Sequence, residues 1–390
     1  MNKFESSSAI SKGLGNALQT IADIGSLPAI RGRWFFVDPY KGADTSSGKT
    51  IDTAVASLSS AYEKCLDEAG DGICILSAGD TAAETSSYLK TAMTWAKDGI
   101  TVVGIGAPVK MFKRARISNK QVTTTAALTV VEGALKVITR AAGSFITDGW
   151  EVGMTLVTAG DQTVTSVVTA VAALSITVKD NLTASAAGIS SITSSVPILI
   201  TLTGTNNSFY NLGFWNGGTA AADVGGIKIT GHRNYFGDCH IVGGAGAASA
   251  NQYSVLIEAG EENTFENCVI GTDTVDRGDN ADAELILKGK SARNRFKGCE
   301  FLSWVTAGTA HGAIHSNGTN GGRVTLFENC VFNSLYSTTT PADVHLVTGT
   351  VSKIAMKSCA CYNFTGWGAS VAVDNAATAA SAAGGIATTE

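Results

Sequence analysis

Four acids in one glycine- and asparagine-rich segment are the residues whose types and spacing best suit catalysis. The segment GTDTVDRGDNADAELILKGK (271–290) carries an aspartate at every third position, beside Arg277: Asp273, Asp276, Asp279 and Asp282. A carbohydrate lyase would use clustered acids to bind calcium and a nearby Arg or Lys as the base. A glycoside hydrolase would need two carboxylates about 5–9.5 Å apart.

The alternative interpretation of this segment is a long solvated turn. Acids spaced three apart in a loop need not converge on one point, so the turn is the favoured interpretation. Carboxylates stacked from neighbouring repeats would be stronger evidence of a site, but Glu258, Glu266 and Glu328 lie far apart or at different positions of the repeat described below. We therefore assign no catalytic residue, and the four aspartates with Arg277 stay as candidates if the chain is an enzyme.

Aromatic and histidine residues offer a second kind of site. Trp215, Trp304 and Trp367 are candidate platforms for sugar rings, with buried packing as the favoured alternative. His311 and His315 are four residues apart, a ligand spacing on a helix but not on a strand, so we interpret them as structural. We expect neither a metal nor a cofactor.

Composition and charge narrow the class of protein. The 390 residues include 44 Gly and 5 Pro, only 16% are charged, and the net charge is −5 with a pI near 5.6. An acidic chain lacks the basic face that nucleic-acid binding requires. The sequence has neither an apolar run long enough to span a membrane nor a secretory signal, so we expect a protein made in a cytoplasm, without membrane insertion.

One octet recurs along the second half of the chain. Its copies are NSFYNLGF (207–214), NYFGDCHI (234–241), NTFENCVI (263–270), NRFKGCEF (294–301), TLFENCVF (325–332) and, more degenerate, IAMKSCAC (354–361). The aligned residues Phe209, Phe236, Phe265, Phe296, Phe327 and Met356 are 27, 29, 31, 31 and 29 residues apart. A period of this length indicates a solenoid, a propeller or an array.

Each repeat reads as strand, one-residue corner, strand. Apolar residues three and five positions after the aromatic share one face of a strand, whereas the interval of three before them breaks the alternation. The corner residue between the strands is usually Asn, Asp or Gly, which tolerate a left-handed backbone. A further apolar strand precedes each octet: 197–202, 225–230, 253–258, 283–288, 312–316 and 343–347. Three short strands per turn predict an all-β, right-handed parallel β-helix.

Stacking of such repeats turns each position into a ladder with steps of about 4.8 Å. We expect a packed interior column of thiols: Cys239, Cys268, Cys299, Cys330 and Cys359. Disulfides are the less favoured alternative because neighbouring rungs point their Cβ atoms the same way. We expect Asn207, Asn234, Asn263 and Asn294 to form a polar ladder at the outer turn.

The rest of the chain is expected to cap and decorate the solenoid. Residues 34–65 predict a strand, a turn and a helix capped by Asp52 or Thr53, and residues 85–99 predict a second short helix. The section 138–180 has alternating strands with Gly turns, as in a small barrel or sandwich. The predicted domains are an arm (1–33), the solenoid start with its capping helix (34–117), an inserted β domain (118–196), the main rungs (197–368) and a low-complexity tail (369–390).

Two phrases resemble parts of bacteriophage particles. VDPYKGADTSSGKTIDTAVASL (37–58) resembles the opening of pectate-lyase-like β-helix proteins of virions, a resemblance that covers about residues 34–110 and 197–365. SFITDGWEVGMTLVTAG (144–160) resembles the small β modules inserted in many virion proteins. This scaffold serves polysaccharide lyases, hydrolases and inert virion parts, so the resemblance is more specific for fold than for function.

Two functions follow from the resemblance as expectations. The first is a non-enzymatic virion protein (a capsid decoration, head spike or fibre component), assembled in the host cytoplasm as a homotrimer that contacts major capsid or tail proteins. The second is a tailspike depolymerase that cuts a bacterial surface polysaccharide. Plain adhesion to such a polysaccharide would need the aromatic residues but not the acids.

Overall fold

The computed structural model describes most of the chain. The described residues are 30–77, 86–106, 114–130, 136–183, 185–218, 223–244, 252–276, 283–305, 311–317, 324–336, 343–348, 353–368 and 371–374. The predicted terminal arm and tail lie almost wholly outside these ranges. Among the described residues, no helix combines the length and the apolar character needed to cross a membrane.

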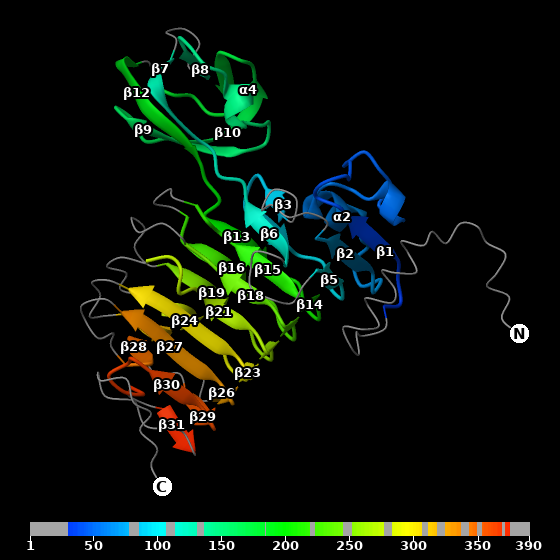
Figure 1. Cartoon of the computed structure of the whole chain (residues 1–390), viewed down its shortest axis with the longest axis vertical. Helices are drawn as coiled ribbons and strands as arrows, with labels where there is room; N and C mark the ends of the chain where they lie inside the picture. The colour runs from blue at the N-terminus through cyan, green and yellow to red at the C-terminus, as the bar shows by residue number, and fades with distance from the viewer. Residues whose placement is uncertain are drawn as a thin grey trace, which may run out of the picture.

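The main body is a right-handed parallel β-helix, as the repeat predicts (Figure 1). Sheet 1 runs β1 (Trp34–Val37), β2 (Gly72–Leu76), β5 (Thr101–Ile105), β14 (Ser208–Tyr210), β17 (Tyr235–Gly237), β20 (Thr264–Glu266), β23 (Arg295–Lys297), β26 (Val324–Glu328), β29 (Lys353–Lys357), β31 (Val371–Asp374). Its strands are parallel and in register from rung to rung, with Phe236 opposite Phe265 and Phe265 opposite Phe296.

Two further parallel sheets complete the described solenoid. Sheet 2 runs β4 (Met93–Trp95), β13 (Ile198–Leu202), β16 (Gly225–Ile229), β19 (Tyr253–Glu258), β22 (Ala283–Lys288), β25 (Gly312–Asn317), β28 (His345–Thr348). Sheet 3 runs β3 (Ser86–Leu89), β6 (Ala115–Asn119), β15 (Leu212–Trp215), β18 (His240–Val242), β21 (Val269–Gly271), β24 (Glu300–Val305), β27 (Val331–Tyr336), β30 (Ala360–Tyr362). The apolar segments predicted upstream of the octets are the strands of sheet 2.

Each octet bends from sheet 1 into sheet 3 at a left-handed corner. The corner residues Asn211, Asp238, Asn267, Gly298, Asn329 and Ser358 have φ between 51° and 63°. Asn, Asp and Gly adopt this region at little cost because their side chains are short or absent. The predicted order of strand, one-residue corner and strand is confirmed.

The aromatic residue of each octet stacks on the one in the next rung. Neighbouring rings from Phe209 through Phe327 have centroids 4.7–4.9 Å apart and planes within 11° of parallel. All five side chains are at most 1% exposed. Burying a phenylalanine contributes about 1.5–3 kcal/mol, so this column is a main part of the apolar core.

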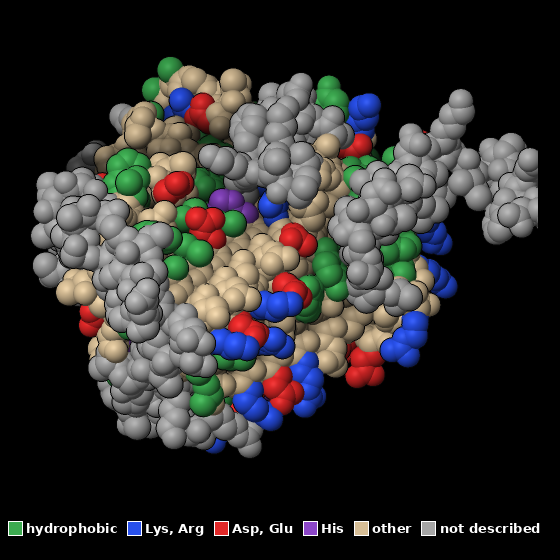
Figure 2. Space-filling model, turned by 60° about the horizontal axis from the view of Figure 1, so that its bottom comes forward, with side chains coloured by type: hydrophobic (Ala, Val, Ile, Leu, Met, Phe, Trp, Pro, Cys, Tyr) green, Lys and Arg blue, Asp and Glu red, His purple; other side chains and the backbone are tan. Residues whose placement is uncertain are grey.

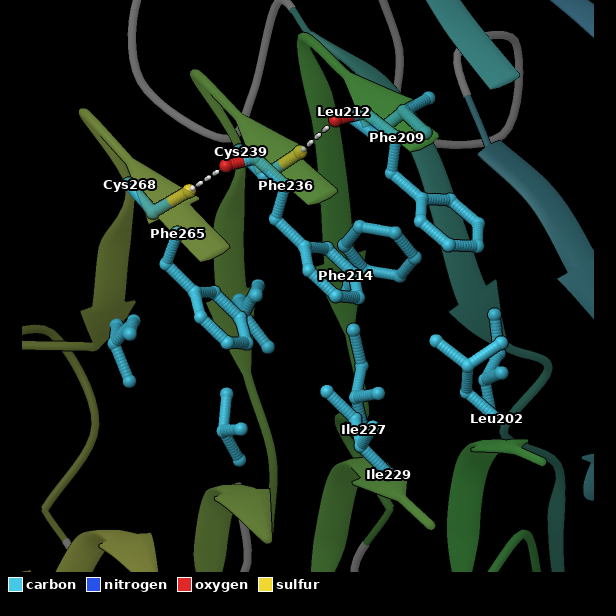
Figure 3. Close-up of a cluster of buried hydrophobic side chains, with 14 of the residues drawn as sticks. Leu202, Phe209, Leu212, Phe214, Ile227, Ile229, Phe236, Cys239, Phe265 and Cys268 are labelled. Atoms are coloured by element: carbon cyan, nitrogen blue, oxygen red, sulfur yellow. Dashed lines mark hydrogen bonds between the residues drawn. The ribbon is translucent and has the colours of Figure 1, made fainter. Parts of the chain in front are cut away.

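The cysteine column lies beside the rings, inside the solenoid, as predicted (Figure 3). Each thiol donates to the carbonyl of the aromatic residue one rung earlier; for example, Cys268 Sγ lies 3.4 Å from Phe236 O and Cys299 Sγ lies 3.4 Å from Phe265 O. All eight cysteines are free and buried. Burial raises the pKa of Cys268 well above the usual thiol range, so the donor proton stays on sulfur.

The asparagine ladder forms as predicted, but it is buried, so its predicted place at an outer turn is wrong. Asn207, Asn234, Asn263 and Asn294 are at most 1% exposed. The amide oxygens of Asn234, Asn263 and Asn294 each accept from the preceding asparagine. For example, Asn263 Oδ1 accepts from the backbone N–H of Asn234 at 3.0 Å and from its side-chain NH₂ at 3.1 Å. The turn buries backbone N–H groups that need acceptors, and an inward amide supplies them.

The N-terminal cap differs from the prediction in two details. Helix α2 (Leu58–Lys64) begins after Ser57, whose Oγ accepts from Ser60 N, while Asp52 and Thr53 belong to the short 3-10 helix η1 (Ile51–Thr53). The segment expected to form a second helix instead forms β3 and β4. There Met93 and Trp95 are buried and Thr94 is exposed, the alternation of a strand.

The inserted module is a closed barrel of antiparallel strands, one of the two predicted alternatives, a small barrel or a sandwich. It contains β7 (Thr123–Val130), β8 (Val137–Arg140), helix α4 (Phe145–Asp148), β9 (Thr155–Gly160), β10 (Thr165–Val171), β11 (Ser175–Val178) and β12 (Ser185–Ser194). The barrel has its own core, including Leu128, Phe145 and Trp150. It lies at one end of the solenoid, next to β6 and β13 (Figure 1).

Charges on the outside of sheet 1 alternate from rung to rung. Glu266, Lys297, Glu328 and Lys357 occupy one registered row. Lys297 Nζ lies 2.7 Å from Glu266, and Lys357 Nζ lies 3.3 Å from Glu328. Figure 2 likewise shows acidic and basic side chains next to one another rather than in patches of one sign. Each exposed pair contributes little energy, but a one-rung slip would place like charges together.

Replacing Asn263 by Ala should destabilise the solenoid by about 2–4 kcal/mol, because it leaves buried donors of Asn234 without their acceptor. The measurement is the denaturant midpoint of unfolding, followed by circular dichroism. Asn317→Ala is the control, since Asn317 is an exposed residue of the same solenoid. Equal midpoints for the two variants would contradict the role given to the ladder.

Candidate functional site

A groove on the outer face of sheet 3, lined by both polar and aromatic residues, contains Trp215, one of the predicted residues. It has a volume of about 500 Å³ and lies where the chain leaves the solenoid for the barrel. Its lining residues are Ser86, Tyr88, Arg116, Ser118, Asn119, Lys120, Gln121, Trp215 and Gly217. The charged members, Arg116 and Lys120, are both basic.

Strand alternation places these side chains outside the core. Ile117 and Phe214 point into the solenoid and are fully buried in its core, so their neighbours along the strands point outward. Registered pairing then creates two outward rows across β3, β6 and β15. One row is Tyr88, Ser118 and Trp215; the other is Ser86, Arg116 and Gly213. Two aromatic side chains therefore flank a serine.

A tight turn positions Trp215 at its end of the groove. Gly217 N donates to Asn119 Oδ1 at 2.9 Å, which ties the turn after β15 to β6. A Cβ atom on Gly217 would lie only 2.4 Å from Trp215 Nε1, so the indole packs directly against this glycine. The sequence Trp215-Asn216-Gly217 thus fixes the orientation of the ring, because any larger residue at 217 would displace it.

The electrostatics of the groove are set by burial and by the barrel. Arg116 is 8% exposed, and burial lowers the pKa of its guanidinium, which nevertheless stays protonated at neutral pH. Lys120 pairs with Glu151 of the barrel, whose other carboxylate oxygen lies 2.8 Å from Lys90 Nζ. Burial raises the pKa of Glu151, but the bonds from both lysines outweigh it and leave this pKa below the usual value. We call Lys90, Lys120 and Glu151 the junction clamp.

A second cavity, of about 620 Å³, lies on the other side of Tyr88, between helix α2 and the barrel residue Gly153. Its polar groups are already engaged in local structure. Asp44 Oδ1 accepts from the backbone N–H groups of Ala56 and Ser57 at 3.0 and 2.8 Å. Tyr62 Oη accepts from the backbone N–H of Lys97 at 2.9 Å. This cavity is therefore built mainly by contacts that hold the cap.

The predicted acid cluster is only partly described. Asp273 and Asp276 follow strand β21, whereas Arg277, Asp279 and Asp282 lie outside the described residues. The described part of the chain contains no group of three or more His, Cys, Asp and Glu side chains placed to hold a metal ion. Burial lowers the pKa of the His240 imidazole to about 4. The negative charge of Asp273 partly offsets this effect by raising the same pKa.

The other candidate aromatic and histidine residues are dispersed. Trp304 lies on β24, on the same sheet as Trp215 but several rungs away. Trp367 packs edge-on against Phe332, with centroids 6.1 Å apart, and so borders the core. His311 is fully buried, while His315 Nε2 lies 2.8 Å from Thr348 Oγ1. The structure thus gathers none of these residues with Trp215.

Tyr88, Arg116 and Lys120 are groove residues that the sequence alone did not indicate. Their rungs precede the regular octets, so no repeat marked their position. The available signal was the alternation in ARISN (115–119), which puts Arg116 and Ser118 on the polar side of a strand.

No family model matches the chain, and no curated protein matches it. One solved structure with a similar course of the chain is a pectin methylesterase from carrot, at 11% identity and TM-score 0.44; the match covers 92% of this chain and 86% of that chain. Another is a pectate lyase, also at 11% identity and TM-score 0.44; the match covers 92% of this chain and 80% of that chain. A third is a protein of Geobacillus virus E2, at 11% identity and TM-score 0.40; the match covers 91% of this chain but 56% of that chain.

Replacing Glu151 by Gln should loosen the barrel at the junction clamp. The change removes two partly exposed ion pairs, worth about 1 kcal/mol together, so the local opening should rise about fivefold. The measurement is amide hydrogen exchange of Thr155, whose N–H donates to Lys90 O across the junction at 3.3 Å. Because the pKa of Glu151 is lowered on folding, the clamp should hold at neutral pH and weaken as the pH falls through that lowered value.

Glu258→Gln is the matched control for this experiment. Glu258 also bridges two lysines, Lys228 and Lys288, but within the solenoid. Thr155 exchange that is unchanged in Glu151→Gln, or that changes equally in Glu258→Gln, would contradict the role of the junction clamp.

Proposed function

We propose that this chain is a non-enzymatic structural protein of a bacteriophage virion, a capsid decoration, head spike or fibre component that stabilises the particle or displays a surface for host adhesion. One observation carries the proposal. The two segments that resemble virion proteins lie in two separate parts of this one chain. Residues 37–58 form the cap of the solenoid, and residues 144–160 form α4 and β9 of the barrel.

The build of the solenoid supports a durable particle component. Its core is continuous along the axis, with stacked rings, buried thiols and an internal amide ladder. Because every rung stabilises its neighbours, local opening at one rung costs contacts on both sides. Such a body suits a protein that must survive outside a cell.

The partners that we propose follow from the same role. They are other copies of this chain, as a homotrimer, and major capsid or tail proteins of the particle, with assembly in the host cytoplasm. Figure 1 shows the barrel beside the solenoid, near β6 and β13. We propose that the barrel docks on a neighbouring particle protein. The net charge of −5 makes nucleic acid an unsuitable partner.

A tailspike depolymerase is the second candidate function, and one observation favours it. His240 and Glu300 lie on the same outward row of sheet 3 as Arg116, with one rung between them. A hydrolase would need a second carboxylate close to Glu300, and a lyase would need a base beside a bound acid. Reducing ends or unsaturated products released from host capsule or lipopolysaccharide would decide for this alternative.

The virion proposal predicts that the chain is a component of purified particles. Particles from the genome that encodes it should be banded by density gradient, stripped of loosely bound protein with high salt and analysed by mass spectrometry. We expect the chain at a stoichiometry that is a multiple of three. Its absence from infectious, salt-washed particles would contradict the proposal.

A further inference from the structure

The outer face of sheet 3 is mostly apolar over its last four strands, β21, β24, β27 and β30. Phe301 and Phe332 are buried in the core, so the residues beside them along β24 and β27 point outward. The large apolar side chains that point outward from these four strands are Val269, Leu302, Trp304, Val331, Leu335 and Tyr362. We call these six residues the apolar face.

Registered pairing gathers the six side chains into one patch. Trp304 lies opposite Leu335, and Val269 and Val331 lie on either side of Glu300 in one row. Leu335 is 47% exposed, and the other five side chains are half-buried. A contiguous patch of exposed apolar side chains on a folded protein marks an interaction surface.

Charge is nearly absent from this patch. The outer face of sheet 1 at the same rungs carries ion pairs such as that between Lys297 and Glu266. By contrast, Glu300 is the only charged residue that points outward from the four strands, and it forms no ion pair within the described part of the chain. Few charges together with Trp and Tyr are the composition of the centre of a protein interface.

A second copy of this chain fits the apolar face in spacing and in charge. The rows of the face repeat at steps of about 4.8 Å, and another parallel solenoid presents rows with the same step. In a ring of copies with parallel axes, equal rungs lie at equal height. The rung of Glu300 includes residues 288–297, which contain five basic residues and no acid. The carboxylate of one copy therefore lies level with a basic segment of the next.

We propose that the apolar face is the surface through which copies of this chain associate as a homotrimer. Trp304 and Leu335 pack against the neighbouring copy, and Glu300 pairs with the basic segment 288–297 of that copy. A stable contact buries about 800 Å² on each partner, so the apolar face forms its centre and charged residues form its rim. The inference rests on the homotrimer of the proposed function and assigns the surface that builds it.

The experiment is analytical ultracentrifugation of the full chain over a range of concentrations. We expect the parent chain to sediment as a trimer. Leu335→Asp should raise the concentration at which half of the chains are trimeric by about tenfold or more, since it places an unpaired carboxylate in the buried contact. Glu300→Lys should also weaken association, because it sets a cation against the basic segment of the next copy.

Leu174→Asp is the matched control. Leu174 is 49% exposed, almost as much as Leu335, but it lies in the turn between β10 and β11 of the barrel. It should associate as the parent does, and circular dichroism checks that each variant folds. If Leu335→Asp does not fold, Glu300→Lys decides. A parent chain that is monomeric or dimeric would overturn the inference, as would equal weakening in Leu335→Asp and Leu174→Asp, or unchanged association in the folded variants of the face.

The composition of particles tests the virion role separately. A chain that is found in particles but is monomeric in solution would overturn this inference alone. A chain that is absent from particles, but whose trimer dissociates in Leu335→Asp, would overturn the virion role and leave the apolar face in place.

Discussion

In-register stacking of parallel rungs is the constraint on which every other feature of this molecule depends. Steps of about 4.8 Å bring identical positions of successive repeats into contact, so one favourable choice of residue is multiplied along the axis. The phenylalanine rings satisfy this constraint with centroids 4.7–4.9 Å apart. The same step lets each thiol donate to a carbonyl of the preceding rung. It also lets the asparagine side chains of successive turns form hydrogen bonds with one another.

The first rungs show how the stack begins and how it accommodates the inserted barrel. The asparagine ladder begins at the first rungs, where Trp95 Nε1 and Ile100 N donate to Asn207 Oδ1 at 3.2 and 3.0 Å. The barrel interrupts the chain but not the stack, because β5 still pairs with β14 and β6 with β15. The first and last strands of the barrel pair with each other, with Thr123 opposite Thr193. Because the two ends of the insertion are close together, the insertion adds little loop-closure entropy to the cost of folding the solenoid.

The fold is predictable from the sequence where the period is visible and not where the period is interrupted. The octets 207–214 to 354–361 fix the corners and the interior column, because every copy carries the same information. The asparagine ladder was misplaced because polarity was equated with exposure, although a buried turn also needs acceptors for N–H groups. In residues 85–99, Ala, Lys and Met locally favour a helix, whereas pairing of β3 with β6 and of β4 with β13 makes the segment two strands. Of the groove residues, Trp215 is the one candidate that the sequence prediction contains; its partners come from the irregular first rungs, where strand alternation is the available signal.

A crystal structure that resolves ring orientations would test the central claim most directly. In-register stacking predicts one continuous interior column, with the ring of Phe265 parallel to those of Phe236 and Phe296 and with Cys268 Sγ directed at Phe236 O. Cysteines of successive octets on different sheets, or facing solvent, would contradict the register and with it the account of the core, the cap and the groove.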